Sequence, residues 1–176
     1  MLDIGCDRGY FIRHVRAVER WGIDQRDVSA DLGDDITFVR GDGTTADLPE
    51  AHFGTVFMSN YLEHLPNSDA VIAQLKAARR LLAPGGRVIV LQPNIRLTKA
   101  AYWDFIDHHV ALTERSLVEA GQLAGLQTER LIVRFLPYTT KGRLPVDSRL
   151  VRWYLRVPLA WRLMGQQTLW VGRQAG

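Results

Sequence analysis

The sequence predicts an α/β domain built on a doubly wound, mostly parallel sheet, and three observations support that prediction. Short apolar runs typical of buried strands alternate with segments whose apolar residues recur at helical spacing. Such alternation is typical of β-α-β units, in which helices cover both faces of a sheet. The opening stretch MLDIGCDRGY places an acidic residue and glycines directly after an apolar run, as in nucleotide-binding turns between a strand and a helix. The length of 176 residues fits a single domain.

Strands are expected at short apolar runs that lack a helical period. Seven are predicted, at residues 2–4, 21–24, 36–40, 55–59, 87–91, 128–136 (TERLIVRFL) and 167–173 (QTLWVGR).

The clearest helix is predicted over residues 68–82. Asn67 and Ser68 are candidate caps at its start, and the Pro-Gly-Gly turn at 84–86 follows its end. A second helix is expected to begin after the cap residue Thr113 and to run to about Ala124.

Two further segments have a helical pattern. In the connection between the first two strands, Phe11, Ile12, Val15 and Val18 recur at helical spacing. Near the end of the chain, RLVRWYLRVPLAWRLMG (149–165) is predicted to be a helix that Pro158 kinks.

Composition narrows the functional classes. The net charge is +3, but residues 126–176 hold nine Lys and Arg against two Asp and Glu, whereas residues 1–125 hold 13 against 17. A basic tail is consistent with binding to an anionic substrate, a membrane surface or nucleic acid. It is equally consistent with arginines that only keep the protein in solution. No apolar run approaches the length of a membrane span, so a cytoplasmic protein is expected. Cys6 is the one cysteine and is expected to be a small buried hydrophobe.

The glycine spacing of the opening turn discriminates between two kinds of nucleotide site. The dinucleotide fingerprint needs glycines at its first, third and sixth positions, and here Gly5, Asp7 and Tyr10 stand there. This spacing disfavours a nicotinamide-dependent oxidoreductase. The turn instead matches Asp-x-Gly-x-x-x-Gly, with Asp3 at the strand end and Gly5 and Gly9 on either side of the turn.

The stretch LDIGCDRG resembles motif I of the class I S-adenosylmethionine-dependent methyltransferases, in particular those of type 11. That family usually has a further glycine where Asp7 stands. A carboxylate is tolerable there because the cofactor carries a sulfonium and an ammonium group rather than phosphates. Members of the family usually have a helical segment before motif I, so we expect this chain to lack part of that cover.

Further motifs follow in the family's order. VRGDGTTADLPEAHFGTVFMSNYLEHL and LLAPGGRVIVLQPN resemble its third to fifth strands and the turns between them. The resemblance implies a Rossmann-like sheet with strand order 3-2-1-4-5-7-6 and an antiparallel strand 7. It also implies that Asp24 accepts hydrogen bonds from the ribose hydroxyls of the cofactor, and that Asp42 faces the adenine amino group. The cofactor-binding residues that we carry over are Asp3, Gly5, Cys6, Gly9, Asp24, Asp42, Gly43 and Asn60.

The acceptor side is less defined by the sequence. Beyond Asn94, QPNIR, AYWDFIDHH, LTERSL and PYTTKGRLP resemble a bacterial branch of the family without an assigned acceptor. The insertion at about 94–112 lies on the acceptor side. Its aromatic residues are expected either to form a wall of the acceptor pocket or simply to pack in the core. His64 is the first candidate for a catalytic base, and His108 is a second. Glu63 and His64 could ligate a divalent ion, but spacing places no third ligand, so no metal site is predicted.

The sequence therefore predicts a methyltransferase that uses S-adenosylmethionine and methylates a small-molecule, glycan or lipid-linked acceptor, with oxygen as the expected accepting atom. The alternative is a non-catalytic domain that keeps the fold for protein interaction. Arginines and aromatic residues at 149–162 are expected either to contact a membrane surface or to pack on the sheet. No nucleic-acid partner is expected, because no RNA-binding module accompanies this segment.

Overall fold

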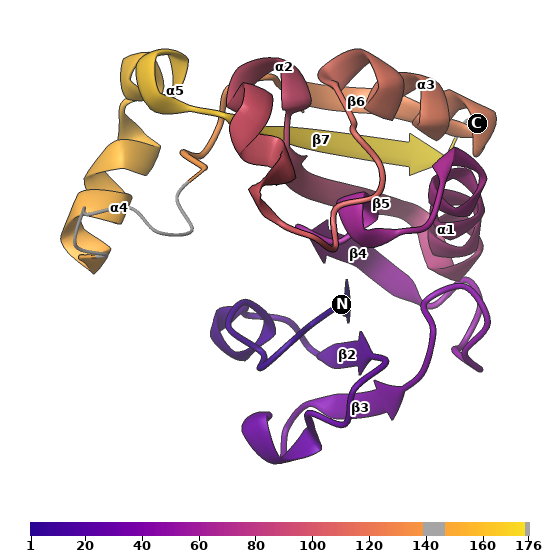
Figure 1. The fold of residues 1–176 in the computed structure, drawn as a ribbon. Helices are drawn as coiled ribbons and strands as arrows, with labels where there is room; N and C mark the ends of the chain where they lie inside the picture. Colours follow the sequence, from indigo (N-terminus) through magenta and orange to yellow (C-terminus); the bar gives the residue numbers. More distant parts are fainter. Residues whose placement is uncertain (139–146, 175–176) are drawn as a thin grey trace.

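The computed structural model describes residues 1–138 and 147–174, and a single seven-stranded sheet forms its centre (Figure 1). The strands are β1 (Leu2–Ile4), β2 (Trp21–Asp24), β3 (Thr37–Arg40), β4 (Phe53–Ser59), β5 (Leu82–Pro93), β6 (Leu126–Ile132) and β7 (Gln167–Gln174). Their order is β3-β2-β1-β4-β5-β7-β6. β7 is antiparallel to β5 and β6, and the remaining pairs are parallel. The predicted fold class is confirmed.

Helical segments connect these strands. The α-helices are α1 (Ser68–Leu81), α2 (Ile95–Thr98), α3 (Glu114–Leu123), α4 (Ser148–Arg156) and α5 (Pro158–Met164). Short 3-10 helices are η1 (Ile12–His14), η2 (Ser29–Asp31), η3 (Leu62–His64) and η4 (Lys99–Asp104). Most of the PYTTKGRLP stretch lies outside the described residues.

The two predicted helices at 68–82 and after Thr113 are confirmed with their caps. In α1 the Asn67 side chain accepts a hydrogen bond from the backbone N–H of Ala70 at 2.9 Å. In α3 the Thr113 side chain accepts from the backbone N–H of Ser116, whose hydroxyl accepts from the N–H of Thr113. These reciprocal bonds satisfy donors that the first helical turn leaves free.

The first connection differs from its prediction. Only the 3-10 turn η1 forms in residues 11–18, and Val18 is fully exposed. No side chain caps η1. A connection this short, with β-branched valines at 15 and 18, gains little from a helix that it cannot cap or bury. Phe11 nevertheless reaches the sheet, where its ring stacks on Phe57 with the centroids 3.9 Å apart.

The helical pattern at 149–165 also differs in detail, because it divides into two helices. Pro158 is the first residue of α5, a position at which a missing backbone N–H costs nothing. The predicted kink is therefore a break between α4 and α5. In Figure 1 both helices project from the side of the sheet, away from α1 and α3. The sixth strand begins and ends earlier than predicted, and β5 is longer because it starts directly after α1.

The core lies between the sheet and the helices α1 and α3, which cover one of its faces. Side chains in β5 alternate, with Val88 and Val90 buried on that face and Ile89 half-buried on the other. Trp170 of β7 is fully buried, and its indole N–H donates a hydrogen bond to Thr128 at 2.9 Å. The Trp170 ring fills the space above Gly121, where α3 crosses the sheet.

Replacing Gly121 by alanine tests this packing. A Cβ at residue 121 would stand 2.5 Å from the Trp170 ring, so we expect Gly121→Ala to lower the free energy of unfolding by about 1–3 kcal/mol, although alanine is the better helix former. Chemical denaturation measures the change. Gly54→Ala is the matched control, because no atom lies within 4 Å of that Cβ and we expect a change within about 0.5 kcal/mol. An unchanged Gly121→Ala protein would show that the Trp170 ring is free to move aside.

Candidate cofactor and acceptor site

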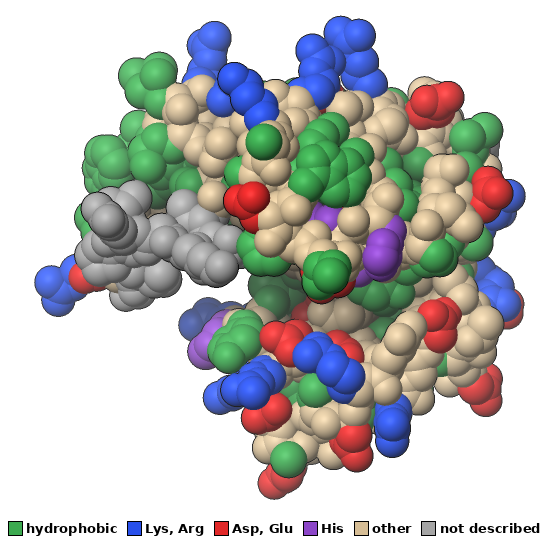
Figure 2. All heavy atoms as spheres, in the orientation of Figure 1, with side chains coloured by type: hydrophobic (Ala, Val, Ile, Leu, Met, Phe, Trp, Pro, Cys, Tyr) green, Lys and Arg blue, Asp and Glu red, His purple; other side chains and the backbone are tan. Residues whose placement is uncertain are grey.

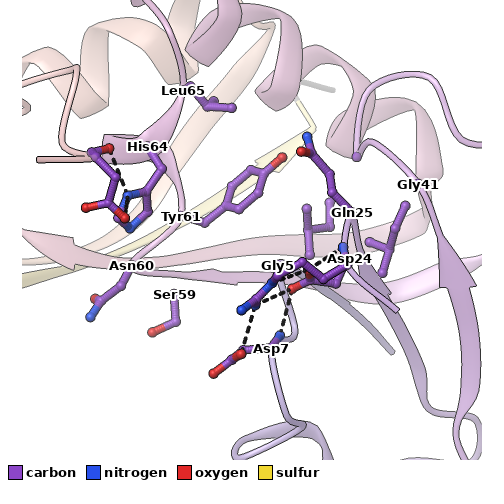
Figure 3. Close-up of a pocket in the computed structure, with 15 residues that line it drawn as sticks. Gly5, Asp7, Asp24, Gln25, Gly41, Ser59, Asn60, Tyr61, His64 and Leu65 are labelled. Carbon is purple, nitrogen blue, oxygen red and sulfur yellow. Dashed lines mark hydrogen bonds and ion pairs between the residues drawn. The ribbon is translucent and has the colours of Figure 1, made fainter. Parts of the chain in front are cut away.

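A cavity of about 680 Å³ opens at the carboxyl edge of the central strands. The strand order reverses between β1 and β4, and ligands of open α/β sheets bind at such a reversal. Figure 2 shows the hollow in this face of the molecule, with histidine side chains at its rim. In Figure 3 Gly5 and Asp24 stand at one end of the cavity and His64 stands at the other.

The turn after β1 has the backbone conformation of a glycine-rich loop. Gly5 has a positive φ of 71°, and Asp7 has a positive φ of 45°. Aspartate is one of the few residues that tolerate this left-handed conformation. The backbone N–H of Asp7 donates to the Asp24 carboxylate at 3.0 Å, which ties the turn to β2. Asp7 therefore keeps the backbone path of the glycine that it replaces.

The Asp24 carboxylate is fully engaged by its neighbours. Arg26 donates to it from its backbone N–H, from Nε and from Nη2, at 3.0–3.2 Å, and Asp7 provides a fourth hydrogen bond. The Arg26 guanidinium also pairs with the Asp7 carboxylate at 2.8 Å. Burial alone would raise the pKa of Asp24, but the bonds from Arg26 and Asp7 outweigh it and hold that pKa below its usual value. A ligand hydroxyl can bind Asp24 only where Arg26 gives way.

Asp3 lies beneath this turn as a second, more deeply buried carboxyl group. Only 2% of it is exposed, and burial together with the nearby Asp24 charge raises the pKa of Asp3 to about 7. A buried carboxylate without a counter-charge is unfavourable, so the environment favours the neutral form. A cationic group in the adjacent cavity would favour the ionised form of Asp3.

A buried glutamine organises the third loop of the site. Gln74 of α1 is fully buried, accepts a hydrogen bond from the Tyr61 hydroxyl at 3.0 Å, and donates to the Gly43 carbonyl at 3.2 Å. The Asp42 carboxylate accepts hydrogen bonds from its neighbours Thr44 and Gln25. Gln74 thus fixes two cavity-lining residues from a helix that does not itself reach the cavity.

Glu63, His64 and His108 gather at the other end. Glu63 is 1% exposed, and burial raises its pKa to about 8. The His64 Nδ1 lies 3.0 Å from the Asp107 carbonyl oxygen and 3.3 Å from its carboxylate. The His108 ring stacks on Phe105 and meets the Tyr102 ring edge-on, and burial with the nearby His64 lowers the pKa of His108.

Half of the site residues predicted from the sequence line the cavity, and the other half lie behind or beside it. Those that line the cavity are Gly5, Asp24, Gly43, Asn60 and His64. Those that lie behind or beside it are Asp3, Cys6, Gly9, Asp42 and His108.

Sequence reasoning missed Arg26, Tyr61 and Gln74, which also belong to the site. A signal existed for Gln74, because it is a polar residue on the apolar face that Val71, Leu75 and Ala78 define.

The comparisons with known proteins concern the family and the fold. A family model described as "Methyltransferase domain" matches residues 1–131. No curated protein matches the chain.

Solved structures share the fold at low sequence identity. An S-adenosylmethionine-dependent methyltransferase from Archaeoglobus fulgidus aligns with a TM-score of 0.72 at 16% identity, over 98% of this chain and 85% of its own. One from Mesorhizobium loti aligns with a TM-score of 0.68 at 19% identity, over 98% of this chain and 89% of its own. A chain from a Haloferax volcanii complex that contains the Trm112 methyltransferase activator aligns with a TM-score of 0.72 at 17% identity, over 99% and 82%.

Removing the Gln74 side chain tests its role in the site. We expect Gln74→Ala to lower the free energy of unfolding by about 1–3 kcal/mol, because the Tyr61 hydroxyl and the Gly43 carbonyl both lose a buried partner. Lys76→Ala on the exposed side of the same helix is the control, with an expected change within about 0.5 kcal/mol. Equal unfolding midpoints for the two variants in urea would contradict this role.

Proposed function

We infer the function from one premise, which is that this chain belongs to the methyltransferase domain family. We propose that it transfers the methyl group of S-adenosylmethionine to a hydroxyl oxygen of a small-molecule, glycan or lipid-linked acceptor. The observation that carries the proposal is the single cavity that joins the Gly5 and Asp24 end to the His64 end. One continuous cavity allows a donor and an acceptor to be held in line, which is the main requirement of a methyl transfer.

The residues at the Asp24 end fit this cofactor. Its ammonium and sulfonium charges suit a site with two carboxyl groups, Asp3 beneath the turn and Asp24 at its rim. A carboxylate is an acceptor-only group and suits a ribose diol. A Cβ at Gly43 would stand 2.7 Å from Gln74 and from Ile4, so glycine lets this cavity-lining loop pack closely against both.

The two ends of the cavity would have different roles in the reaction. S-adenosylmethionine supplies a methyl group on a positively charged sulfur, which departs as a neutral thioether while the acceptor oxygen forms the new bond to carbon. Asp3 and Asp24 would hold the donor. His64 and His108 stand at the acceptor end, where the hydroxyl proton must leave.

The exposed face of α4 and α5 supports an acceptor at a lipid surface. In α4 the three arginines at 149, 152 and 156 lie on one side of the helix, and apolar residues cover the rest. Of these apolar residues only Tyr154 is buried, whereas Trp153 is 61% exposed. In α5 Leu159 and Leu163 are also exposed. Arginine on one face and Trp or Leu on the other is typical of helices that lie in the interface of anionic membranes. None of the described helices is long and apolar enough to cross a membrane.

A second candidate function is a protein-interaction domain without catalysis. The engagement of Asp24 by Arg26 favours it, because the four hydrogen bonds use the positions that a ribose would need. Cofactor binding discriminates between the two functions.

Calorimetric titration with S-adenosylmethionine and S-adenosylhomocysteine tests the proposal, with NADH as a negative control. We expect Asp24→Ala to weaken binding by about 1–3 kcal/mol, because the ribose loses its acceptor. Arg26→Ala is the matched variant, since it removes the two guanidinium hydrogen bonds to the carboxylate and keeps the carboxylate itself, and we expect equal or tighter binding. Failure of both the unmodified chain and Arg26→Ala to bind either ligand would favour the interaction domain.

Sedimentation with vesicles tests the lipid surface. We expect the chain to bind vesicles that contain anionic lipid, and the double variant Trp153→Ser with Leu155→Ser to bind about tenfold or more weakly, because it loses apolar area that would be buried in the interface. Leu123→Ser removes a leucine at the end of α3 that is more exposed than Leu155 and should bind like the unmodified chain. Equal binding by both variants, or none by the unmodified chain, would remove the lipid surface from the proposal.

A further inference from the structure

Glu63, His64 and His108 form a cluster whose composition methyl transfer alone does not require. One ligand atom from each lies within 4.8 Å of the other two. Glu63 and His64 belong to η3, and His108 comes from the segment after η4. A base for a hydroxyl group needs one imidazole, whereas this cluster brings two imidazoles and a buried carboxyl group to one point.

Two of these polar atoms are buried without a partner. Glu63 Oε2 and His108 Nδ1 have no hydrogen-bond partner within residues 1–138 and 147–174. An unpartnered buried polar atom costs about 1–3 kcal/mol, so two of them in one cluster indicate that they face a bound species.

The third residue already has the orientation of a metal ligand. A carbonyl oxygen only accepts, so the 3.0 Å contact with the Asp107 carbonyl places the proton of His64 on Nδ1. The Asp107 carboxylate lies beside the same nitrogen at 3.3 Å. The Nε2 lone pair of His64 is therefore free. Metal-binding histidines typically donate their other ring N–H to a carbonyl or a carboxylate in this way.

The backbone holds the two contributing segments together. The Glu63 carbonyl accepts hydrogen bonds from the N–H groups of His109 and Val110, at 2.8 and 3.1 Å. The Tyr102 hydroxyl donates to the Val110 carbonyl, and the Tyr102 ring packs on His108. The geometry of the cluster is therefore fixed before any ligand arrives.

We propose that Glu63, His64 and His108 bind a divalent first-row transition-metal ion next to the acceptor end of the cavity, which His64 lines. One carboxylate and two imidazoles suit ions such as Zn²⁺ and Mn²⁺, whereas Mg²⁺ prefers oxygen ligands in octahedral geometry. The spacing of Glu63 and His64 along the chain gives only two ligands. The fold supplies the third by laying residue 108 against η3.

The role of the ion rests on the proposed function, although its binding does not. Three protein ligands leave coordination positions open, and an acceptor hydroxyl bound there would lose its proton to solvent more readily. The resulting oxygen would attack the methyl carbon while the carbon–sulfur bond breaks. In this role His64 and His108 bind the ion, and the ion binds the acceptor hydroxyl.

Titration of the chelator-treated protein tests the site. We expect calorimetry to show one Zn²⁺ or Mn²⁺ per chain, with Mg²⁺ binding at least about tenfold more weakly. Bound Co²⁺ should give visible absorption bands that depend on the same residues. The variants Glu63→Gln and His108→Ala should each lose this binding. Asp107→Ala should weaken it by about tenfold, because it removes the carboxylate behind His64.

Two controls keep the outcome interpretable. His109→Ala removes the exposed neighbouring histidine and should bind the ion like the unmodified chain. Glu63→Gln removes a buried carboxyl group, so its thermal unfolding shows whether a loss of binding reflects misfolding. Ion binding that survives both Glu63→Gln and His108→Ala, or no binding by the unmodified chain, would overturn the proposal. S-adenosylmethionine is titrated separately. A chain that binds S-adenosylmethionine but binds no metal ion would overturn only the metal site.

Discussion

The pairing of β1 with both β2 and β4 is the constraint on which the rest of the structure depends. Ile4 lies level with Ile23 on one side and with Met58 on the other, so the three strands end at the same edge. Each strand is followed directly by residues of the site, because parallel strands present their carboxyl ends together. A one-residue shift of β1 would turn its buried side chains to the opposite face and separate Gly5 from Asp24.

The two ends of the cavity differ in how their polar groups are satisfied. At the Asp24 end, Arg26, Asp7 and Gln74 form hydrogen bonds with neighbouring groups, and only the buried Asp3 carboxyl group lacks a counter-charge among the residues described above. At the acceptor end, Glu63 and His108 have buried polar atoms to which no described residue forms a hydrogen bond. At the first end a ligand hydroxyl would have to displace the bonds from Arg26, whereas at the second end a bound species would satisfy polar atoms that otherwise have no hydrogen-bond partner.

Much of the fold could be predicted because local signals and burial agreed. Capping residues, the Pro-Gly-Gly turn and the apolar runs predicted α1, α3 and the strands, and the motifs implied the strand order. The connection at 11–18 could not be predicted from its apolar spacing, because capping and burial decide whether such a segment becomes helical. The cluster around Glu63 also escaped prediction. Its third member is brought in by backbone hydrogen bonds, which leave no pattern in side-chain spacing.

The backbone bonds from residues 109 and 110 to Glu63 have an evolutionary consequence. Main-chain hydrogen bonds do not depend on side-chain identity, so they survive substitutions that change the neighbouring side chains. The exposed residues 103, 104 and 106 can therefore diverge while His108 keeps its register against η3. Selection can act on this short exposed stretch alone, while the geometry of the Glu63, His64 and His108 cluster stays unchanged.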